Sequence, residues 1–108
     1  MKFNEMNANE ILALAENGDS QAQYIVGIMY EDGVELPQNY NKAVIWYRKS
    51  AELGNADAQC TLGFKLLEGI ATSHDQQEEA QKWFLAAAQQ GHGAARALVD
   101  ATEFVKSL

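Results

Sequence analysis

The chain has 108 residues, of which 47% are hydrophobic, so it is long enough for one folded domain and lacks the composition of a disordered protein. Eight Lys and Arg residues stand against 15 Asp and Glu residues, which gives a formal net charge of −7. A protein that binds a phosphate backbone needs a basic face, so this charge argues against nucleic acid as a partner. The excess of acid favours either solubility alone or a basic protein partner.

Cysteine content and hydropathy narrow the class of protein further. Cys60 is the single cysteine, so no intramolecular disulfide can form. No apolar run approaches the roughly 20 residues of a membrane span, and the N-terminus lacks the apolar core of a signal peptide. We therefore expect a cytoplasmic protein with no membrane contact.

Six helices are predicted in chain order, and residues 1–6 precede them. Their expected ranges are 7–17, 21–31, 41–53, 56–67, 75–90 and 93–106. The expected N-terminal caps are Asn7 or Asn9, a Ser20-x-x-Gln23 capping box, Asn39 or Asn41, and Asp75-x-x-Glu78. Glycines are expected to end the helices at positions 18, 33, 54, 69 and 91.

The sequence repeats itself along these helices. Residues 54–59 restate residues 18–23, and the pattern of the third helix returns in the fifth. The matching positions are Ala43 with Ala80, Trp46 with Trp83, Tyr47 with Phe84, Ala51 with Ala88, and Gly54 with Gly91. A repeat of this length predicts stacked helix pairs.

We expect an all-α, right-handed superhelix (solenoid) of about two and a half helix-pair repeats. Residues 1–108 would form a single repeat domain. Its parts would be a half repeat at 7–18, repeats at 19–54 and 55–91, and a capping helix at 92–108. Asp100 stands where the two repeats have Gly27 and Gly63, which fits a terminal helix with no following unit to approach.

Gly27 and Gly63 lie in the middle of predicted helices, where glycine is about 1 kcal/mol less favourable than alanine. We expect them to allow close approach of the backbone of a neighbouring helix. The aromatic pairs one repeat apart, Trp46-Tyr47 and Trp83-Phe84, predict core packing rather than an exposed stacking surface.

No constellation of residues predicts catalysis, a metal or a cofactor. His74, His92 and Cys60 lie on different elements, without the spacing of metal ligands. Cys60 has no neighbouring base that would activate it as a nucleophile, so a small buried residue is the favoured interpretation.

The residues Val26-Gly27-x-x-Tyr30, followed by Ala43 and Tyr47, resemble the core motif of tetratricopeptide repeats. The unit here is longer, and its extra length falls between Gly33 and Tyr40. That longer unit, with Trp46-Tyr47 and Lys49-Ser50-Ala51-Glu52-x-Gly54, resembles the Sel-one-like repeat family.

This resemblance implies a non-enzymatic adaptor or scaffold that binds other proteins. Some bacterial members of the family are secreted, contain paired cysteines and bind penicillin-like ligands, and this chain lacks their disulfide framework. In tetratricopeptide-like arrays the first helix of each pair lines a concave groove. The groove residues that the resemblance selects are Gln21, Tyr24, Ile28, Glu31, Asp57, Cys60, Phe64, Leu67, Glu68, Ala101 and Phe104.

These positions describe an apolar strip with an acidic rim, which would suit a partner peptide or helix with apolar anchors and basic residues. Three alternatives stay open at this point. The groove could close on itself, the strip could be buried in a homodimer, or the groove could serve as the pocket of a small ligand-binding protein or enzyme.

Overall fold

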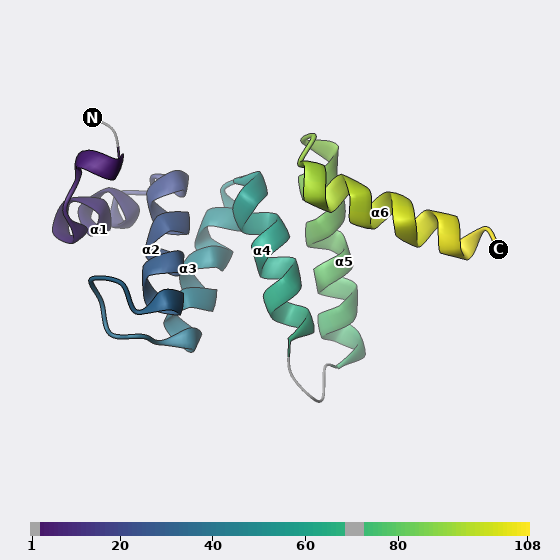
Figure 1. Ribbon diagram of the computed structural model, residues 1–108, viewed down its shortest axis with the longest axis horizontal. Coiled ribbons are helices and arrows are strands. Elements are labelled where there is room, and N and C mark those ends of the chain that lie inside the picture. Colours follow the sequence, from purple (N-terminus) through teal and green to yellow (C-terminus); the bar gives the residue numbers. More distant parts are fainter. Residues whose placement is uncertain (1–2, 69–72) are drawn as a thin grey trace. The chain divides into compact units, whose positions relative to one another are not determined.

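A computed structural model describes residues 3–68 and 73–108 of the chain. Within these ranges the regular structure is entirely helical, with one 3-10 turn at Phe3–Glu5 and no strand. The six α-helices are α1 (Ala8–Glu16), α2 (Ser20–Asp32), α3 (Tyr40–Glu52), α4 (Ala56–Leu67), α5 (His74–Gln89) and α6 (Gly93–Lys106) (Figure 1). The predicted order and number of helices are confirmed for this part of the chain.

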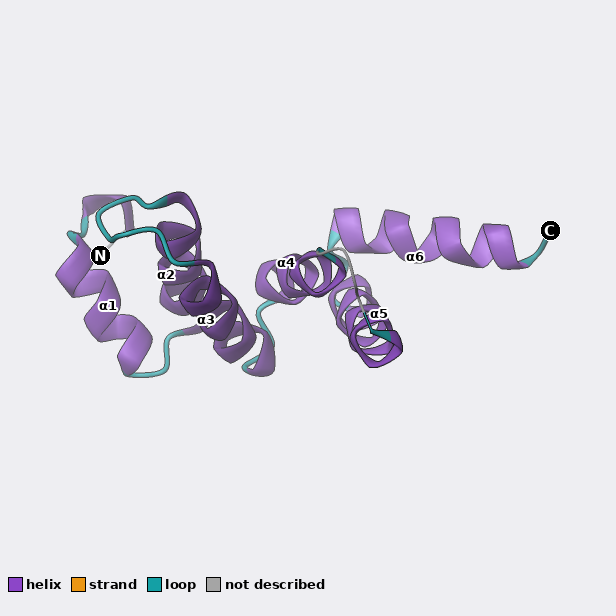
Figure 2. Cartoon of the chain, turned by 90° about the horizontal axis from the view of Figure 1, so that it is seen from below, coloured by secondary structure: helices purple, strands orange, loops and turns teal. Residues whose placement is uncertain are grey.

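The helices divide into two compact units, Met1–Asn55 with α1 to α3 and Ala56–Leu108 with α4 to α6. In the first unit α2 packs against both α1 and α3. In the second unit α5 packs against both α4 and α6. Figure 2 shows the C-terminal half of α6 extending away from α4 and α5, which agrees with the exposure of every residue from 100 to 108. The single domain expected from the sequence stays a prediction.

Helices α1, α2, α3 and α5 are capped at their N-termini by short polar side chains, but two of these caps differ from those expected. Asn7 and Asn39 cap α1 and α3, as predicted. Helix α2 is capped by Asp19, whose carboxylate accepts from the Ala22 N–H at 2.8 Å. The predicted capping box at α2 is wrong because Gln23 is buried and donates instead to the Ala15 carbonyl oxygen of α1 at 3.0 Å.

The second difference concerns α5. Ser73 caps this helix in a reciprocal box with Gln76, so the helix begins one residue before the expected Asp75 cap. In this box the Ser73 hydroxyl accepts from the Gln76 N–H and the Gln76 side chain accepts from the Ser73 N–H, so two backbone N–H groups are satisfied at once. Among the expected helix stops, Gly18, Gly33, Gly54 and Gly91 all have positive φ. The stop expected at Gly69 lies outside the described residues.

Each unit is centred on an aromatic ring seated against a helical glycine. A Cβ atom on Gly27 would lie 2.5 Å from two carbons of the Tyr47 ring, and a Cβ on Gly63 would lie 2.6 Å from the Phe84 ring. The predicted close approach is therefore real, but the neighbour that fills it is an aromatic side chain of the next helix rather than its backbone.

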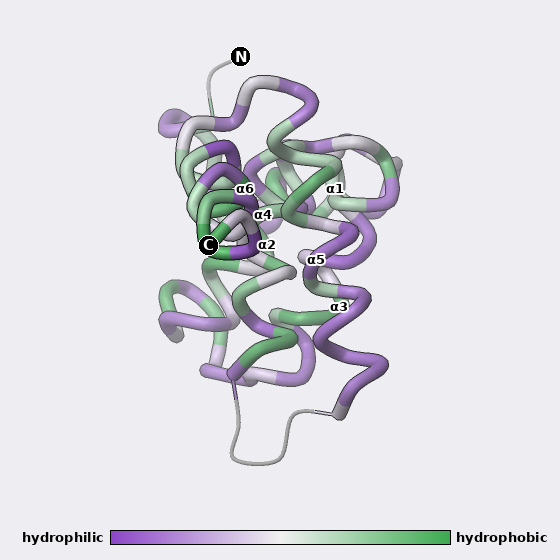
Figure 3. The backbone as a smooth tube through the Cα atoms, turned by 90° about the vertical axis from the view of Figure 1, so that its right-hand side faces the viewer, coloured by the Kyte–Doolittle hydropathy of each residue, from purple (hydrophilic) through white to green (hydrophobic). Residues whose placement is uncertain are grey.

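The remaining core consists of small side chains with a few larger ones between them. In α3 the spaced residues Ala43, Tyr47 and Ala51 are buried, as expected. Trp46 is half-buried and packs against the α1–α2 core. Green and purple alternate along the helices in Figure 3, as expected for helices that each bury one face.

In α5 the buried set is Ala80, Phe84, Ala87 and Ala88. Trp83 is half-buried and its indole N–H donates to Glu79 at 3.4 Å. The core packing predicted for the aromatic pairs therefore falls mainly on Tyr47 and Phe84, and the two tryptophans lie at the edge.

Replacing Gly27 by Ala should destabilise the protein. Overpacking a core in this way costs about 1–3 kcal/mol, of which the better helix propensity of Ala recovers about 1. Gly93 at the start of α6 is the matched control, because a Cβ there meets nothing within 4 Å. We expect Gly93→Ala to leave the urea midpoint unchanged or to raise it, and Gly27→Ala to lower it. Equal midpoints for the two variants would contradict the ring-on-glycine packing.

Candidate partner-binding surfaces

The residues expected in the groove on α2 follow one another along one face of the first unit. Gln21 is exposed and accepts from the Asn55 side-chain amide at 3.1 Å. Tyr24 is half-buried, and its ring centroid lies 5.7 Å from that of Tyr47. Ile28 is also half-buried. This face therefore offers partial aromatic and aliphatic surface beside an amide.

Glu31 has a structural partner that the sequence did not reveal. The Tyr47 hydroxyl donates to its carboxylate at 2.6 Å. Burial, and after it this hydrogen bond, raises the pKa of Tyr47 above that of an exposed tyrosine. The available signal was the difference between Tyr47 and Phe84 at equivalent positions, since only the first ring carries a hydroxyl.

The residues expected on α4 separate into buried and exposed members. Cys60 is only 4% exposed, and burial, with a smaller contribution from Asp57, raises the pKa of its thiol. Its side chain is therefore not presented to solvent. Phe64 and Leu67 are 46% and 42% exposed, and Glu68 is exposed beside Lys65 at 3.2 Å.

Phe64 is exposed but held in one orientation. Its ring stands edge-on to the buried Phe84 ring, with centroids 5.0 Å apart and planes at 68°. Such a pair contributes about 0.5–1.5 kcal/mol beyond its buried area. The free half of the Phe64 ring is therefore a preformed apolar contact on the surface of α4.

Asp57 is linked to the start of α6 through His92. The Nδ1 atom of His92 accepts from the Ala95 N–H at 3.3 Å and so caps the helix. In the neutral ring the proton is then on Nε2, which lies 3.0 Å from the Asp57 carboxylate and donates to it. Asp57, which the sequence predicted at the rim of the groove, thus has a structural partner, His92, in its own unit.

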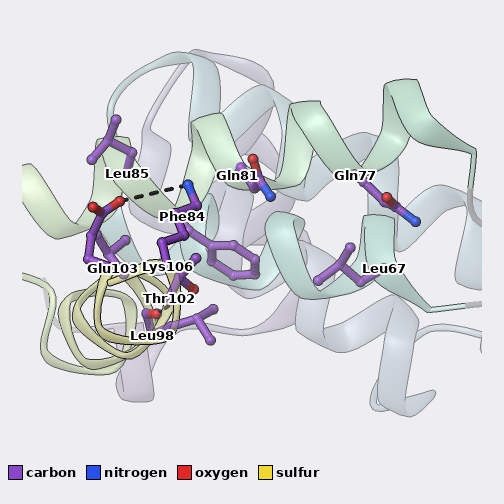
Figure 4. A pocket seen from close by; sticks show the side chains of 10 residues that line it. Leu67, Gln77, Gln81, Phe84, Leu85, Leu98, Thr102, Glu103 and Lys106 are labelled. Carbon is purple, nitrogen blue, oxygen red and sulfur yellow. Dashed lines mark hydrogen bonds and ion pairs between the residues drawn. The ribbon is translucent and has the colours of Figure 1, made fainter. Parts of the chain in front are cut away.

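The residues expected on α6 are both exposed. Ala101 offers little surface, whereas Phe104 is 65% exposed. A second apolar feature of this unit was missed by the sequence analysis. It is a cavity of about 430 Å³ between α5 and α6 (Figure 4). Its lining residues are Leu67, Gln77, Gln81, Phe84, Leu85, Leu98, Val99, Thr102, Glu103 and Lys106.

Only Leu67 of the expected groove residues lines this cavity. The sequence did hold a signal for it at Leu85, which stands where the first repeat has Arg48. An apolar residue at a position that was charged in the preceding repeat indicates additional apolar surface. Figure 4 shows Leu85 near Glu103 and Lys106, whose charged atoms lie 3.8 Å apart.

Two further observations bear on the chemistry of these surfaces. In residues 3–68 and 73–108, no three His, Cys, Asp or Glu side chains come together in a way that could hold a metal ion. In the same ranges, no helix has the length and apolar character needed to cross a membrane.

The helix pairs define an α-helical repeat protein that carries exposed apolar side chains. The model of the Sel1 repeat matches residues 20–55 and 56–92, which together make up more than half of the chain. The chain belongs to the Sel1 repeat family. The resemblance inferred from the sequence is thereby confirmed.

Curated relatives match over part of the chain. This chain is 49% identical over 45 residues to the DAP3-binding cell death enhancer 1 of Rattus norvegicus. The matched segment covers 42% of this chain and 9% of that protein. This chain is 35% identical over 79 residues to the chitin synthase regulatory factor 3 of Schizosaccharomyces pombe. The matched segment covers 71% of this chain and 8% of that protein. The chain thus spans less than a tenth of the length of either relative.

Two solved structures are similar over most of the chain. One is c5321, a protective antigen of uropathogenic Escherichia coli with an SLR fold (TM-score 0.73, 36% identity, 87% of this chain and 20% of that chain). The other is a Sel1 repeat protein from Oxalobacter formigenes (TM-score 0.74, 28% identity, 82% of this chain and 66% of that chain). The predicted all-α solenoid class is confirmed.

The Tyr47–Glu31 contact predicts a dependence of stability on pH. The unfolded chain loses the tyrosine proton near pH 10, whereas folded Tyr47 keeps it to higher pH. The unfolded state then binds fewer protons, so the free energy of unfolding falls as the pH rises. Above about pH 10.5, the free energy of unfolding of wild type should fall more steeply with pH than that of Tyr47→Phe, by up to about 1.4 kcal/mol per pH unit. Parallel curves from urea unfolding would show that Tyr47 titrates normally.

The burial of Cys60 predicts a slow thiol. In the folded protein its reaction with Ellman's reagent at pH 8 should be at least about 100-fold slower than in urea, because both access and thiolate fraction are reduced. The matched control is Leu67→Cys in a Cys60→Ala background, since Leu67 is exposed. Comparable rates for the two folded thiols would place Cys60 on the surface.

Proposed function

We propose that this chain is a non-enzymatic protein-interaction module. Its contact surfaces would be the α2 face of the first unit, with Gln21, Tyr24 and Ile28, and the α4 and α6 surfaces of the second, with Phe64 and Phe104. Whether these surfaces form one groove stays a prediction, as does the cytoplasmic location expected from the sequence. Cys60 is left out of the contact set because it is buried.

The observation that carries the proposal is the exposure and fixed orientation of the Phe64 ring. Its ring is 46% exposed, yet the edge-on contact with Phe84 fixes its orientation. A side chain that is already ordered loses little entropy when a partner covers it. Full burial of a phenylalanine side chain contributes about 1.5–3 kcal/mol, so a few such contacts suffice for specific binding.

The charge of the protein suggests the chemistry of the partner. The net charge is −7, Asp57 is exposed on the same helix as Phe64, and Glu68 is exposed directly after the end of that helix. Opposite charge raises the rate of encounter and selects among partners. A partner segment with an apolar anchor flanked by Lys or Arg would suit this surface.

The relatives support the same class of function. The rat relative is named for binding DAP3, which is a statement about that protein. Together with membership of a repeat family built for protein contact, it favours a protein over a small molecule as the partner. A homodimer that buries the apolar strip stays the alternative from the sequence analysis.

The proposal predicts that exposed phenylalanines, rather than exposed apolar residues in general, are needed for binding. We expect Phe64→Ser/Phe104→Ser to lose partners that wild type captures from a lysate of its own source organism. Ile45→Ser/Leu53→Ser is the matched control, because these side chains are 53% and 58% exposed on α3 and its C-cap. The control should capture the same partners as wild type.

Two further measurements make the result decisive. Circular dichroism and urea midpoints must show that both double variants fold. Light scattering tests the alternative: a mass that falls from dimer to monomer only in Phe64→Ser/Phe104→Ser would assign the surface to self-association. Identical partner sets for the two variants would refute the proposed contact surface.

A further inference from the structure

Helix α3 concentrates the basic residues of the first unit. Among the residues of this unit that the structure describes, the basic side chains are Lys42, Arg48 and Lys49, and all three lie on α3. Glu52 is the one acidic residue of that helix, so three positive charges and one negative charge give it a formal charge of +2. Charges more than about 8 Å apart are largely screened at physiological ionic strength. A ligand at α3 therefore responds chiefly to this local positive charge rather than to the net charge of −7.

Two of these lysines are held by aromatic rings that leave their charge uncompensated. The Lys49 ammonium group lies 4.3 Å from the centroid of the Trp46 ring, and the Lys42 ammonium group lies 5.5 Å from the centroid of the Tyr30 ring. Both lysines are exposed, and within residues 3–68 and 73–108 neither forms an ion pair with a carboxylate. A ring orders an ammonium group but carries no negative charge. The positive charge of both lysines is therefore available to an anion.

Trp46 adds a hydrogen-bond donor to the same face of α3. It lies four residues after Lys42 and three before Lys49, and these spacings place neighbouring side chains on one side of a helix. Trp46 is half-buried, its indole nitrogen is not fully buried, and among the described residues the indole N–H has no acceptor. Two ammonium groups and an indole N–H thus form a set of donors on one face.

The second repeat shows which group binds to the equivalent tryptophan. Trp83 occupies the position of Trp46, and its indole N–H donates to the Glu79 carboxylate at 3.4 Å. Glu79 in turn occupies the position of Lys42. The first repeat therefore keeps the tryptophan donor but has an ammonium group where the second repeat supplies the carboxylate. A carboxylate from another molecule can bind to the indole N–H of Trp46 as Glu79 binds to that of Trp83, with Lys42 as an additional cation.

We propose that the face of α3 formed by Lys42, Trp46 and Lys49 binds an acidic segment of a partner protein. One carboxylate of that segment accepts from the Trp46 indole N–H and lies beside Lys42, and a second carboxylate lies beside Lys49. The two lysines are seven residues apart, which is about 10.5 Å along the helix, so the segment is a run of several Asp or Glu residues. The inference goes beyond the proposed function, because it concerns a different helix face and a partner segment of opposite charge.

The indole N–H resonances of the two tryptophans provide the test. A capped peptide of six glutamates is added to the ¹⁵N-labelled full chain, and both resonances are followed by NMR. We expect a saturable shift of the Trp46 resonance and a much smaller change at Trp83, whose N–H already donates to Glu79. A capped peptide of six glutamines should shift neither resonance, because it carries no charge. The variant Trp83→Phe retains only the Trp46 resonance and so assigns it.

The variant Lys42→Glu gives the first repeat the arrangement of the second. Its own carboxylate can then accept from Trp46, so the free variant should already show the Trp46 shift that the peptide causes in wild type. Its affinity for the glutamate peptide should fall at least about tenfold. Lys82→Glu is the matched control, because it makes the same charge change at an exposed position of α5 in the other unit and should alter the affinity less than about twofold. Lys49→Gln removes one ion pair and should weaken binding about two- to fivefold.

Each outcome decides the inference. The absence of a saturable Trp46 shift, or equal affinities of Lys42→Glu and Lys82→Glu, would overturn it. A Trp46 shift that depends on the concentration of the free chain would also overturn it, by making a second copy the occupant. All substituted lysines are exposed, so urea midpoints close to that of wild type should confirm that the variants fold. Phe64→Ser/Phe104→Ser changes only the other unit and should bind the glutamate peptide as wild type does, so failure of the proposed function leaves this inference intact.

Discussion

The packing of an aromatic ring onto a helical glycine is the contact on which each unit depends. Tyr47 on Gly27 and Phe84 on Gly63 bring two helices closer than any Cβ would permit. Glycine lowers helix propensity by about 1 kcal/mol at each site, and ring burial in a core of small side chains offsets that loss. The surrounding alanines follow from the same constraint, since larger residues would separate the helices.

The same rings also order the surface. Tyr24 packs on Tyr47 and Phe64 packs on Phe84, so each core aromatic fixes a partly exposed aromatic on the preceding helix. Core and candidate binding surface are thus one continuous set of contacts in each unit. Where the glycine is replaced, at Asp100, this arrangement ends.

The helices could be predicted from sequence periodicity because the same helix pattern occurs in both repeats. The caps were harder to predict, since several polar residues stand near each helix start. Ser20 and Gln23 form a valid capping pattern, yet Asp19 caps α2 because Gln23 is buried against α1. For similar reasons the candidate site could be predicted only in part from the sequence. Cys60 and Phe64 occupy one predicted face of α4, but only the structure shows that the thiol is covered and the phenyl ring is half free.

The sequence by itself determined the helical repeat, the family and the positions of the packing glycines, because these depend on local patterns that recur at fixed spacing. Only the tertiary structure decided which polar groups become partners. The Tyr47 hydroxyl finds Glu31 and His92 finds Asp57 across 16 and 35 residues of sequence. It also revealed the cavity between α5 and α6. A cavity is the space left between helices, so no single helix encodes it, and it appears only once the helices are packed.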